Sequence, residues 1–388
     1  MQKEEIALVR GDGAAPEAME VACMIAVEAA KKDDVDLSFP ETPMGWKAYG
    51  DFGDTFPKES FKTATQIGTL FFGGVGDPEI DKTIGTQYPK MRPEARCLLG
   101  IRENWGLLLN FRPMLFNKAF NHLSPLKAEY LPEDGCQQHY IRYLLEDSYF
   151  GTSNVMKMIL QRSKAFYHLL KNIGVCTIDE VNGQERQIIE FAYYTRKNIE
   201  KYLRYAFQYA KDRNLPLISV DKANVMARYK FWRLLCDDIH DSEFPDVELR
   251  HQLVDSANAL LPHPSKLHGV IACGNEHGDI LSDGAAEIFG GMGLMCSSAI
   301  NPDNGVAMFE SGAGTAVDIA GKDLINPLGR IWTAGMMLEH KQMPNGATAI
   351  TNAVTKTLQQ GYATKDFATS GSKIVGTKEM GEMICKNL

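Results

Sequence analysis

The segment VIACGNEHGDILSD, residues 270–283, reads as a buried strand that runs through a loop into a helix. Val270 to Cys273 is apolar throughout, and Gly278 with the alanines beyond the segment favours a helix from that point. Asp279 and Asp283 would then lie on one helical face, about one turn apart. Two such carboxylates can share Mg²⁺ or Mn²⁺, although an acidic pair at this spacing is more often a solvated helix start.

Strand and helix patterns alternate outward from this segment. We expect buried strands at 6–9, 69–72, 107–111 and 217–220, and helices at 16–32, 189–213, 229–240 and 326–340. This alternation favours an α/β fold with at least partly parallel strand pairing. Residues 152–188 have mixed helical character and no evident chemistry, so we interpret them as a peripheral insertion.

The composition is that of an ordinary globular protein, with 388 residues of which 44% are hydrophobic and 23% charged. The net charge of −8 argues against nucleic acid as a partner, because nucleic-acid binding normally needs a basic face. The eight cysteines have no Cys-x-x-Cys spacing, which argues against a zinc site or a disulfide framework. Without a signal-peptide pattern or an apolar run of ~18 residues, we expect no membrane association and a cytoplasmic location.

Three glycine-rich loops are candidates for binding an anion or a nucleotide. Gly73 to Gly76 follows a predicted strand, but its spacing is not Gly-x-Gly-x-x-Gly, and such a strand exit is more often a tight turn. Gly11 to Gly13 is equally ambiguous. The loop from Glu310 to Asp318 is more suggestive, because its small residues admit an anion and Asp318 could accept hydrogen bonds from ribose hydroxyls. A Rossmann domain is not supported.

Three arginines stand near predicted strands. Arg102 and Arg112 flank one short apolar strand, and Arg142 lies in another, seven residues before Tyr149. Guanidinium groups that converge on one pocket would bind a dicarboxylate in bidentate fashion. The sequence leaves their convergence open, since a single arginine is usually a surface residue.

Motifs spaced along the whole chain point to one known family. The most specific are VDKANV at 220–225 and GDILSD at 278–283. The others are GDG at 11–13, GGVG at 73–76, NFRP at 110–113, YFG at 149–151, HQLVD at 251–255 and DIAGK at 318–322. With these motifs the chain resembles the β-decarboxylating dehydrogenases, the family of 3-isopropylmalate, isocitrate, homoisocitrate and tartrate/malate dehydrogenases.

The resemblance implies an oxidative decarboxylation that uses NAD and Mg²⁺ or Mn²⁺. Asp279 and Asp283 resemble metal ligands from one subunit, and Asp255 resembles the ligand that reaches in from the partner subunit. Lys222, also contributed across the dimer, resembles the base that takes the hydroxyl proton of a 2-hydroxy acid. Tyr149 resembles the acid that protonates the enol after CO₂ leaves. The implied assembly is a homodimer with shared active sites.

The resemblance also implies the binding residues. Arg102, Arg112 and Arg142 resemble the clamp on the carboxylates of a small dicarboxylate substrate. Glu94 with Leu98 and Leu99 favours isopropylmalate, the leucine-pathway substrate, as the 3-substituted malate. The residues that resemble the NAD-binding set are Gly73, Gly74, Glu310, Gly314, Asp318, Ile319 and Asn326. Among these, the Asp318–Ile319 pair resembles NAD-using members, because an acidic residue would repel a 2′-phosphate.

The implied architecture is the isopropylmalate/isocitrate dehydrogenase-like fold, with two lobes around a mixed sheet. Residues 1–107 and 294–388 would form a large, discontinuous lobe on the cofactor side. Residues 108–293 would form a small lobe with the dimer interface and the metal and substrate residues, including the insertion at about 152–188. The active site is expected in the cleft between them.

The chain departs from the family pattern at four places. The loop at 313–318 reads AGTAVD and lacks the family's His and Pro, and Ala14-Ala15 alters a loop expected beside the nicotinamide. Glu276 and His277 either retune the site or are solvent-facing loop side chains. The segment 92–102 is one residue longer than usual. Two alternatives therefore stay open: the same chemistry on malate, tartrate, isocitrate or homoisocitrate, or a non-catalytic regulatory paralogue.

Overall fold

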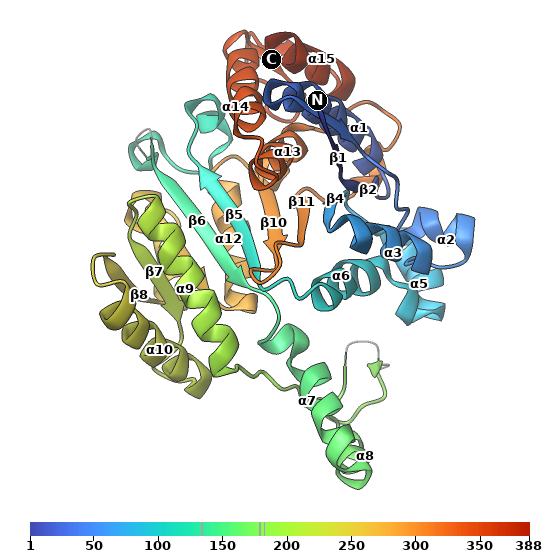
Figure 1. Ribbon diagram of the computed structural model, residues 1–388, viewed down its shortest axis with the longest axis vertical. Helices are drawn as coiled ribbons and strands as arrows, with labels where there is room; N and C mark the ends of the chain where they lie inside the picture. Colours follow the sequence, from blue (N-terminus) through green and yellow to red (C-terminus); the bar gives the residue numbers. More distant parts are fainter. Residues whose placement is uncertain (133–134, 178–179, 182) are drawn as a thin grey trace.

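A nine-stranded mixed sheet runs through the computed structural model, which describes residues 1–132, 135–177, 180–181 and 183–388 (Figure 1). In sheet order its strands are β2 (Ala7–Val9), β4 (Thr69–Phe72), β11 (Ala307–Ser311), β10 (Cys296–Ile300), β5 (Leu109–Leu115), β6 (Gln137–Tyr143), β9 (Gly269–Cys273), β7 (Leu217–Asp221) and β8 (Leu249–Leu253). The first three are parallel and the last four are parallel, while β10 and β5 join the two halves by antiparallel pairing. The predicted α/β class with a mixed sheet is confirmed.

Helices cover both faces of the sheet at each end. At the β8 end, α9 (Arg196–Asp212) and α10 (Ala227–Glu243) pack on one face, and α11 (Val254–Leu260) and α12 (Asn275–Ile288) pack on the other. Neighbouring residues of β6 divide between the two faces, since Ile141 faces α9 and α10 while Tyr140 faces α11 and α12. A sheet covered in this way has buried parallel strands, which explains why β9 is apolar throughout.

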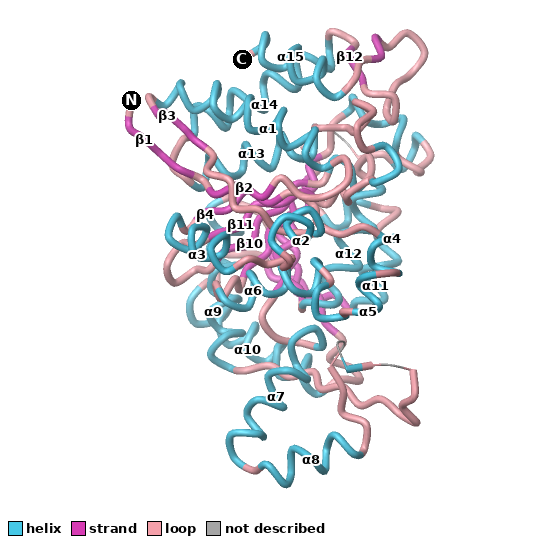
Figure 2. Tube along the Cα trace, turned by 90° about the vertical axis from the view of Figure 1, so that its right-hand side faces the viewer, coloured by secondary structure: helices cyan, strands magenta, loops and turns pink. Residues whose placement is uncertain are grey.

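The β2 end is built in the same way. One face is covered by α1 (Ala15–Ala30), α13 (Leu328–His340), α14 (Pro344–Gln359) and α15 (Thr377–Asn387). The other face is covered by α3 (Lys58–Ile67) and α6 (Gly100–Asn104). Both chain termini lie at the end of the molecule that carries α1 and α15 (Figures 1 and 2).

The remaining elements are short. Two small parallel pairs flank the main sheet, β1 (Gln2–Glu5) with β3 (Val35–Ser38), and β12 (Tyr362–Ala363) with β13 (Lys373–Ile374). Three further helices are short. α2 (Trp46–Phe52) lies between β3 and α3, and α4 (Pro78–Lys82) and α5 (Ile84–Gln87) lie in the connection from β4 to β5. No helix in the described ranges is both long enough and apolar enough to cross a lipid bilayer.

The predicted strands and helices are present, but some bounds differ: the strand expected at 107–111 is β5 at Leu109–Leu115, and the helix expected from Gly278 begins at Asn275 in α12. The strand expected at 69–72 has those bounds in β4, whereas the helix expected from residue 189 begins at Arg196 in α9. Residues before α9 are extended, because Ile189 forms a bridge with Val175 and the amide of Thr195 donates to Glu146 Oε2 at 2.7 Å. Helical periodicity in the sequence could not reveal these tertiary contacts.

Asp12 settles the ambiguity of the first glycine loop. Its carboxylate accepts hydrogen bonds from the amides of Trp46 and Lys47 at 3.0 Å and from the amide of Gly76 at 2.8 Å. Asp12 therefore satisfies the unpaired amides at the start of α2. It also ties that helix to the second glycine loop, so the carboxylate of Asp12 has a structural role.

Residues 148–195 extend away from the sheet and contain α7 (Ser148–Arg162) and α8 (Lys164–Asn172) (Figures 1 and 2). A small apolar cluster of their own, built on Met156, Leu170 and Val175, supports them. The predicted insertion at about 152–188 falls here, and its residues 178, 179 and 182 lie outside the described ranges.

The predicted lobes divide the strands of the sheet cleanly. Residues 1–107 and 294–388 supply β2, β4, β11 and β10, and residues 108–293 supply the other five strands. The boundary therefore falls between β10 and β5. The division into lobes stays a prediction, because the sheet itself is continuous across that boundary.

Candidate active site

The candidate residues lie where parallel strands end at one edge of the sheet. Arg142 is the next-to-last residue of β6 and pairs with Cys273 at the end of β9, which leads into α12. Lys222 follows the end of β7, and Asp255 is the second residue of α11 after β8. Carboxyl ends of parallel strands commonly form ligand sites in α/β proteins.

Five of these residues form what we call the inner cluster: Arg112, Arg142, Tyr149, Asp279 and Asp283. Arg142 Nη1 lies 2.6 Å from Asp279 Oδ1, and Arg112 Nη1 lies 3.0 Å from the same oxygen and 2.8 Å from Asp283 Oδ1. The hydroxyl of Tyr149 donates to Asp279 Oδ2 at 2.8 Å. The predicted i,i+4 acidic pair is thus not a solvated helix start, because both carboxylates face arginines.

Two residues that the sequence analysis did not single out orient these arginines. Arg142 Nε donates to both the backbone oxygen and Oδ1 of Asn275 at 2.9 Å, and Arg112 Nη1 donates to Ser282 Oγ at 2.8 Å. Both residues lie within the segment 275–283, so their position beside Asp279 and Asp283 was the sequence feature that could have identified them. Gly278 lets α12 approach, since a Cβ there would lie 2.9 Å from Arg142 Cγ.

Burial disfavours the charged form of each group in the inner cluster, and neighbouring charges decide the outcome. Burial raises the pKa of Asp279, but Arg142 and Arg112 outweigh it, so this pKa lies below its ordinary value. For Asp283, the effect of burial outweighs that of Arg112, so the pKa of Asp283 is raised. Burial and Arg112 lower the pKa of Arg142 to about 9. Burial and Asp279 raise the pKa of Tyr149 to about 12, so its phenol stays protonated at neutral pH.

Arg102 lies on α6 and pairs with a residue predicted for the cofactor. Its Nη2 lies 2.7 Å from Glu310 Oε1, at the end of β11, and both side chains are largely buried. Arg102 also acts electrostatically on Arg142 and Asp279, which places its charge near the inner cluster. The three predicted clamp arginines are therefore brought toward one region.

Each of these arginines has a buried nitrogen with no hydrogen-bond partner in the described chain. They are Arg102 Nε, Arg112 Nε and Arg142 Nη2. Buried polar groups in proteins are normally paired, so unsatisfied guanidinium nitrogens indicate a place for an acceptor. The donor set fits a ligand with more than one carboxylate.

Lys222 and Asp255, which we call the edge pair, lie apart from the inner cluster. Lys222 Nζ lies 2.6 Å from Asp255 Oδ1, and the Asp255 side chain is 64% exposed. The hydrogen bond from Lys222 lowers the pKa of Asp255. Within the described ranges, no three acidic, His or Cys side chains are grouped closely enough to hold a metal. Asp255 is therefore not grouped with Asp279 and Asp283 within one chain.

The two carboxylates of the inner cluster fit part of a Mg²⁺ or Mn²⁺ site. Oδ1 of Asp279 and Oδ1 of Asp283 both contact the same nitrogen of Arg112, at 3.0 Å and 2.8 Å. Hard oxygen donors that meet at one point suit these cations, which keep water or substrate oxygens as further ligands.

Two of the predicted cofactor loops lie close together. A Cβ on Gly73 would lie 2.2 Å from the backbone oxygen of Arg10, so this glycine is required by close packing. A Cβ on Gly74 would lie 3.6 Å from the backbone oxygen of Gly314, which brings the two loops together. Gly314 and Asp318 are exposed, and nothing lies within 4 Å of a Cβ on Gly314. This open, glycine-containing loop fits a nucleotide.

The last two predicted cofactor residues are already engaged within the protein. Ile319 packs with a small apolar cluster on α1. Asn326 Nδ2 donates to Asp366 Oδ2, and its Oδ1 accepts from the amide of Leu328 at the start of α13, both at 2.9 Å. The side chain of Asn326 therefore forms a local turn directly before that helix, whose N-cap is Pro327.

Glu94, Leu98 and Leu99 belong to a π-helix, Glu94–Leu99, directly before α6. A π-helical turn holds more residues than an α-helical turn, while the extra residue expected in the segment 92–102 stays a prediction. Glu94 is exposed, while Leu98 and Leu99 are half-buried.

The unusual residues before the GDILSD motif have partners. Glu276 Oε2 accepts a hydrogen bond from Ser148 Oγ at 3.0 Å, beside Tyr149. His277 stacks on Tyr229 with ring centroids 4.6 Å apart, and burial lowers the pKa of His277. They are therefore not simply solvent-facing loop side chains.

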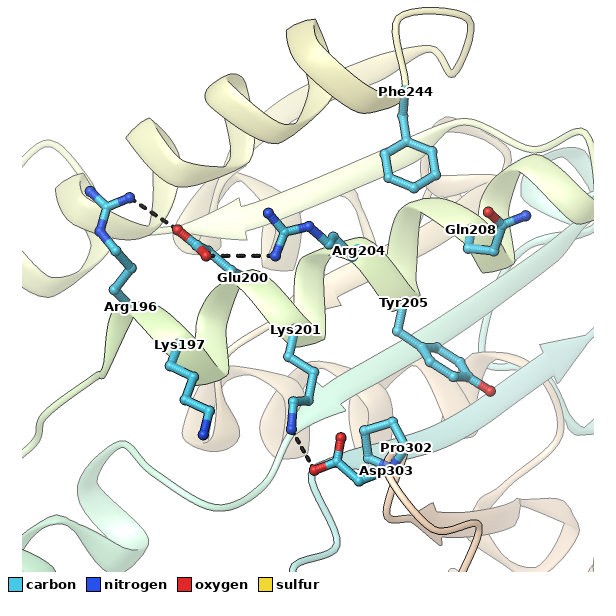
Figure 3. Close-up of a pocket in the computed structure, with 10 residues that line it drawn as sticks. All are labelled: Arg196, Lys197, Glu200, Lys201, Arg204, Tyr205, Gln208, Phe244, Pro302 and Asp303. Atoms are coloured by element: carbon cyan, nitrogen blue, oxygen red, sulfur yellow. Dashed lines mark hydrogen bonds and ion pairs between the residues drawn. The ribbon is translucent and has the colours of Figure 1, made fainter.

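A separate pocket of about 840 Å³ lies over α9 and contains none of these residues (Figure 3). Glu200 pairs with Arg196 at 3.0 Å and with Arg204 at 3.5 Å, and Lys201 pairs with Asp303 at 2.5 Å. Four cationic side chains and two anionic ones line the pocket, so it carries a net positive charge. It contains none of the candidate catalytic or metal-binding residues, so we take the inner cluster and not this pocket as the candidate site.

The comparisons with known proteins agree with this geometry. The family model described as isocitrate/isopropylmalate dehydrogenase matches residues 5–384. The 3-isopropylmalate dehydrogenase of Clostridium pasteurianum is 34% identical over 100% of both chains, and that of Thermotoga maritima is 33% identical over 99% of both. The solved isocitrate dehydrogenase of Methylococcus capsulatus has a TM-score of 0.78 at 26% identity, with 99% of both chains covered. The chain therefore belongs to the isocitrate/isopropylmalate dehydrogenase family, whose members are oxidatively decarboxylating dehydrogenases.

Proposed function

We propose that this chain oxidatively decarboxylates 3-isopropylmalate, with NAD and Mg²⁺ or Mn²⁺, as a homodimer with shared active sites. The observation that carries the proposal is the inner cluster, in which two arginines, two carboxylates and a protonated tyrosine converge. The choice of 3-isopropylmalate as the substrate rests on the full-length relatives that are named 3-isopropylmalate dehydrogenase.

The three arginines would hold the two carboxylates of the malate core. Each guanidinium has a buried nitrogen without a partner in the described part of the chain, and a substrate oxygen would satisfy it. Leu98 and Leu99, on the π-helix before Arg102, would contact the isopropyl group. An apolar substituent suits half-buried leucines better than the extra carboxylate of isocitrate does.

Asp279 and Asp283 would hold the metal together with Asp255 of the partner subunit. When bound, the metal would polarise the substrate hydroxyl and stabilise the negative charge that develops as CO₂ leaves. Arg112 contacts both Asp279 and Asp283, so it would orient the carboxylates as well as bind substrate.

Two residues would move protons. Lys222 of the partner subunit would accept the proton of the substrate hydroxyl at Nζ. Tyr149 would donate its phenolic proton to the carbon that loses CO₂, and the raised pKa of about 12 keeps that proton in place at neutral pH. The Asp279 carboxylate orients the phenol through its hydrogen bond.

NAD would bind at the loop from Glu310 to Asp318, beside Gly74. The exposed Asp318 carboxylate has no side-chain partner in the described residues and would accept hydrogen bonds from ribose hydroxyls. It would also disfavour NADP, because it would repel the 2′-phosphate.

Exposed apolar side chains beside the edge pair support a second copy of the chain as the partner. Val225 is 69% exposed and Met226 36% exposed, and both amides donate to the backbone oxygen of Lys222. Leu234 on α10 is 55% exposed and lines a small hollow with Leu253. Clustered exposed apolar residues are typical of protein interfaces.

The test is NADH formation from 3-isopropylmalate with NAD and Mn²⁺, beside malate, tartrate, isocitrate and homoisocitrate, and with NADP in parallel. We expect turnover of 3-isopropylmalate with NAD to exceed all the others. Faster turnover of another acid would move the function to that substrate. Absence of turnover with every acid, despite a folded dimer, would identify a non-catalytic paralogue.

A further inference from the structure

Arg330 is a fully buried arginine without a carboxylate partner in the described part of the chain. It is the third residue of α13, and its exposure is 2%. Its Nη2 donates to the backbone oxygens of Gly314 at 3.3 Å and Ala313 at 3.5 Å, while Nη1 is buried and has no partner. Burial lowers the pKa of Arg330 to about 10, so the guanidinium is charged at neutral pH.

A buried charge with an unpaired nitrogen lowers the free energy of unfolding, and here it stands in a helix whose buried side is mostly apolar. Its neighbours on the buried side of α13 include Leu328, Ile331 and Ala334, which are apolar. An unpaired buried charge lowers stability, and an apolar side chain at the same place would not. The arginines of the inner cluster differ, because each of them contacts a carboxylate. The cost at Arg330 therefore calls for an explanation outside folding.

The hydrogen bonds of Arg330 fix the orientation of the peptide groups that follow Ala313 and Gly314. All described peptide bonds are trans, so a carbonyl and the following amide point in opposite directions. The carbonyls of Ala313 and Gly314 point toward Arg330, and the amides of Gly314 and Thr315 therefore point away from it. Neither amide has a hydrogen-bond acceptor among the described residues. Gly314 is exposed, and nothing lies within 4 Å of its Cβ position.

The same loop has an unusual backbone conformation. It reads AGTAVD, and Ala316 adopts a left-handed conformation with φ of 45°. A non-glycine residue in that region must be held by its surroundings. The backbone oxygen of Thr315 is held by the amide of Ala14 at 2.8 Å, and Arg330 holds the residues on the other side.

We propose that Arg330 is a positioning residue for the cofactor: it holds the carbonyls of Ala313 and Gly314 so that the amides of Gly314 and Thr315 bind a phosphate group of the dinucleotide. Adjacent backbone amides that point into one space form an anion site, and a buried cation beneath them strengthens it. The inference rests on the proposed function, because it requires a dinucleotide at this loop.

The test compares Arg330→Met and Arg330→Lys with the wild-type protein, and with Arg196→Met as a control at an exposed arginine on α9. The first readout is the Kd of NADH, measured by fluorescence titration of the metal-free protein without substrate. We expect the Kd to rise about tenfold in Arg330→Met, since the hydrogen bonds of a charged group are lost. We expect a smaller rise in Arg330→Lys, which keeps the charge, and no rise in the control.

A second readout separates positioning from a purely structural role. Hydrogen exchange of the Ala313 amide, which donates to Ser311 Oγ at 3.2 Å, should be faster in cofactor-free Arg330→Met, while the Tm should not fall, because an unpaired buried charge has been removed. The KM for NAD should rise far more than kcat falls. A merely structural role would lower the Tm and kcat together.

The outcomes distinguish this inference from the proposed function. If wild-type protein binds NADH and Arg330→Met binds it equally well, the inference is wrong. Unchanged exchange of the Ala313 amide would also overturn it. If wild-type protein binds neither NADH nor NADPH, the proposed function fails, and the cofactor role of Arg330 fails with it. Should Arg330→Met not fold, Arg330→Lys carries the same comparison.

Discussion

The inner cluster and the edge pair lie at the same edge of one sheet, yet their surroundings differ. Arg142 in the inner cluster is 1% exposed at its side chain and contacts Asp279, Asn275 and Tyr149, the last through its ring face. Lys222 and Asp255 in the edge pair contact each other at the surface. The first region is a buried network of contacts within one chain, whereas the second is an isolated pair at the surface, which we propose a second chain completes.

The difference follows from solvent access. Charges in a buried network act strongly on one another, while an exposed ion pair is screened by water. Changes to the inner cluster should therefore alter both stability and catalysis. Changes to the edge pair should alter catalysis alone, and only through the neighbouring subunit.

The largest effect is expected for Arg142→Met. The change leaves Asp279 without its shortest ion pair, and breaking a buried pair lowers the free energy of unfolding by about 3 kcal/mol. Loss of a substrate contact should lower kcat/KM by about 1,000-fold. Urea unfolding and steady-state kinetics measure the two effects. Unchanged stability would mean that the inner cluster is not a coupled network.

The fold and much of the inner cluster could be predicted because they depend on local patterns. Apolar runs such as Thr69 to Phe72 mark buried strands, and the spacing of Asp279 and Asp283 places both on one face of α12. Contacts between distant segments could not be predicted in this way. The pairing of Arg102 with Glu310 and the burial of Arg330 depend on how loops meet in space. A charged residue at an apolar-periodic position of α13 was the only signal for Arg330.

The second prediction asks whether the two regions meet across the dimer. Tyr149→Phe and Lys222→Met should each be nearly inactive as homodimers. When the two are unfolded together and refolded, half of the dimers are mixed, and one site of each mixed dimer is intact. We therefore expect about a quarter of wild-type activity. If both residues served a site within one chain, the mixture would stay inactive, as would each variant refolded alone.

The third prediction concerns the opposite pKa shifts of the two carboxylates in the inner cluster, measured in metal-free protein. Asp279 has a lowered pKa in the folded state, so its stabilisation is present above its ordinary pKa and is lost as the pH falls through the folded value. Asp283 has a raised pKa, so its charged form destabilises the fold at neutral pH and protonation relieves this. Asp279→Asn should therefore lower the free energy of unfolding at pH 7, and Asp283→Asn should raise it.

Both differences should shrink when urea unfolding is repeated under acidic conditions, near and below the pKa values of the two carboxyl groups. The same sign for both variants at pH 7 would contradict the assignment of opposite shifts. A chelator keeps divalent cations out of the comparison.

The smallest effect is expected for the stability of the edge pair. Lys222→Met removes an exposed ion pair, and such pairs contribute little, so the Tm should change by less than about 2 °C. Arg196→Met, which removes an exposed pair on α9, is the matched control. A large fall in Tm that depends on protein concentration would show that Lys222 also stabilises the dimer.

The most direct measurement of the central claim is the stoichiometry of the reaction with 3-isopropylmalate, NAD and Mn²⁺. Oxidative decarboxylation predicts that NADH and CO₂ form in equal amounts and that 4-methyl-2-oxopentanoate is the organic product. NADH without CO₂ would mean that oxidation occurs without decarboxylation. Neither product from 3-isopropylmalate, at cofactor concentrations that saturate the protein, would contradict the account.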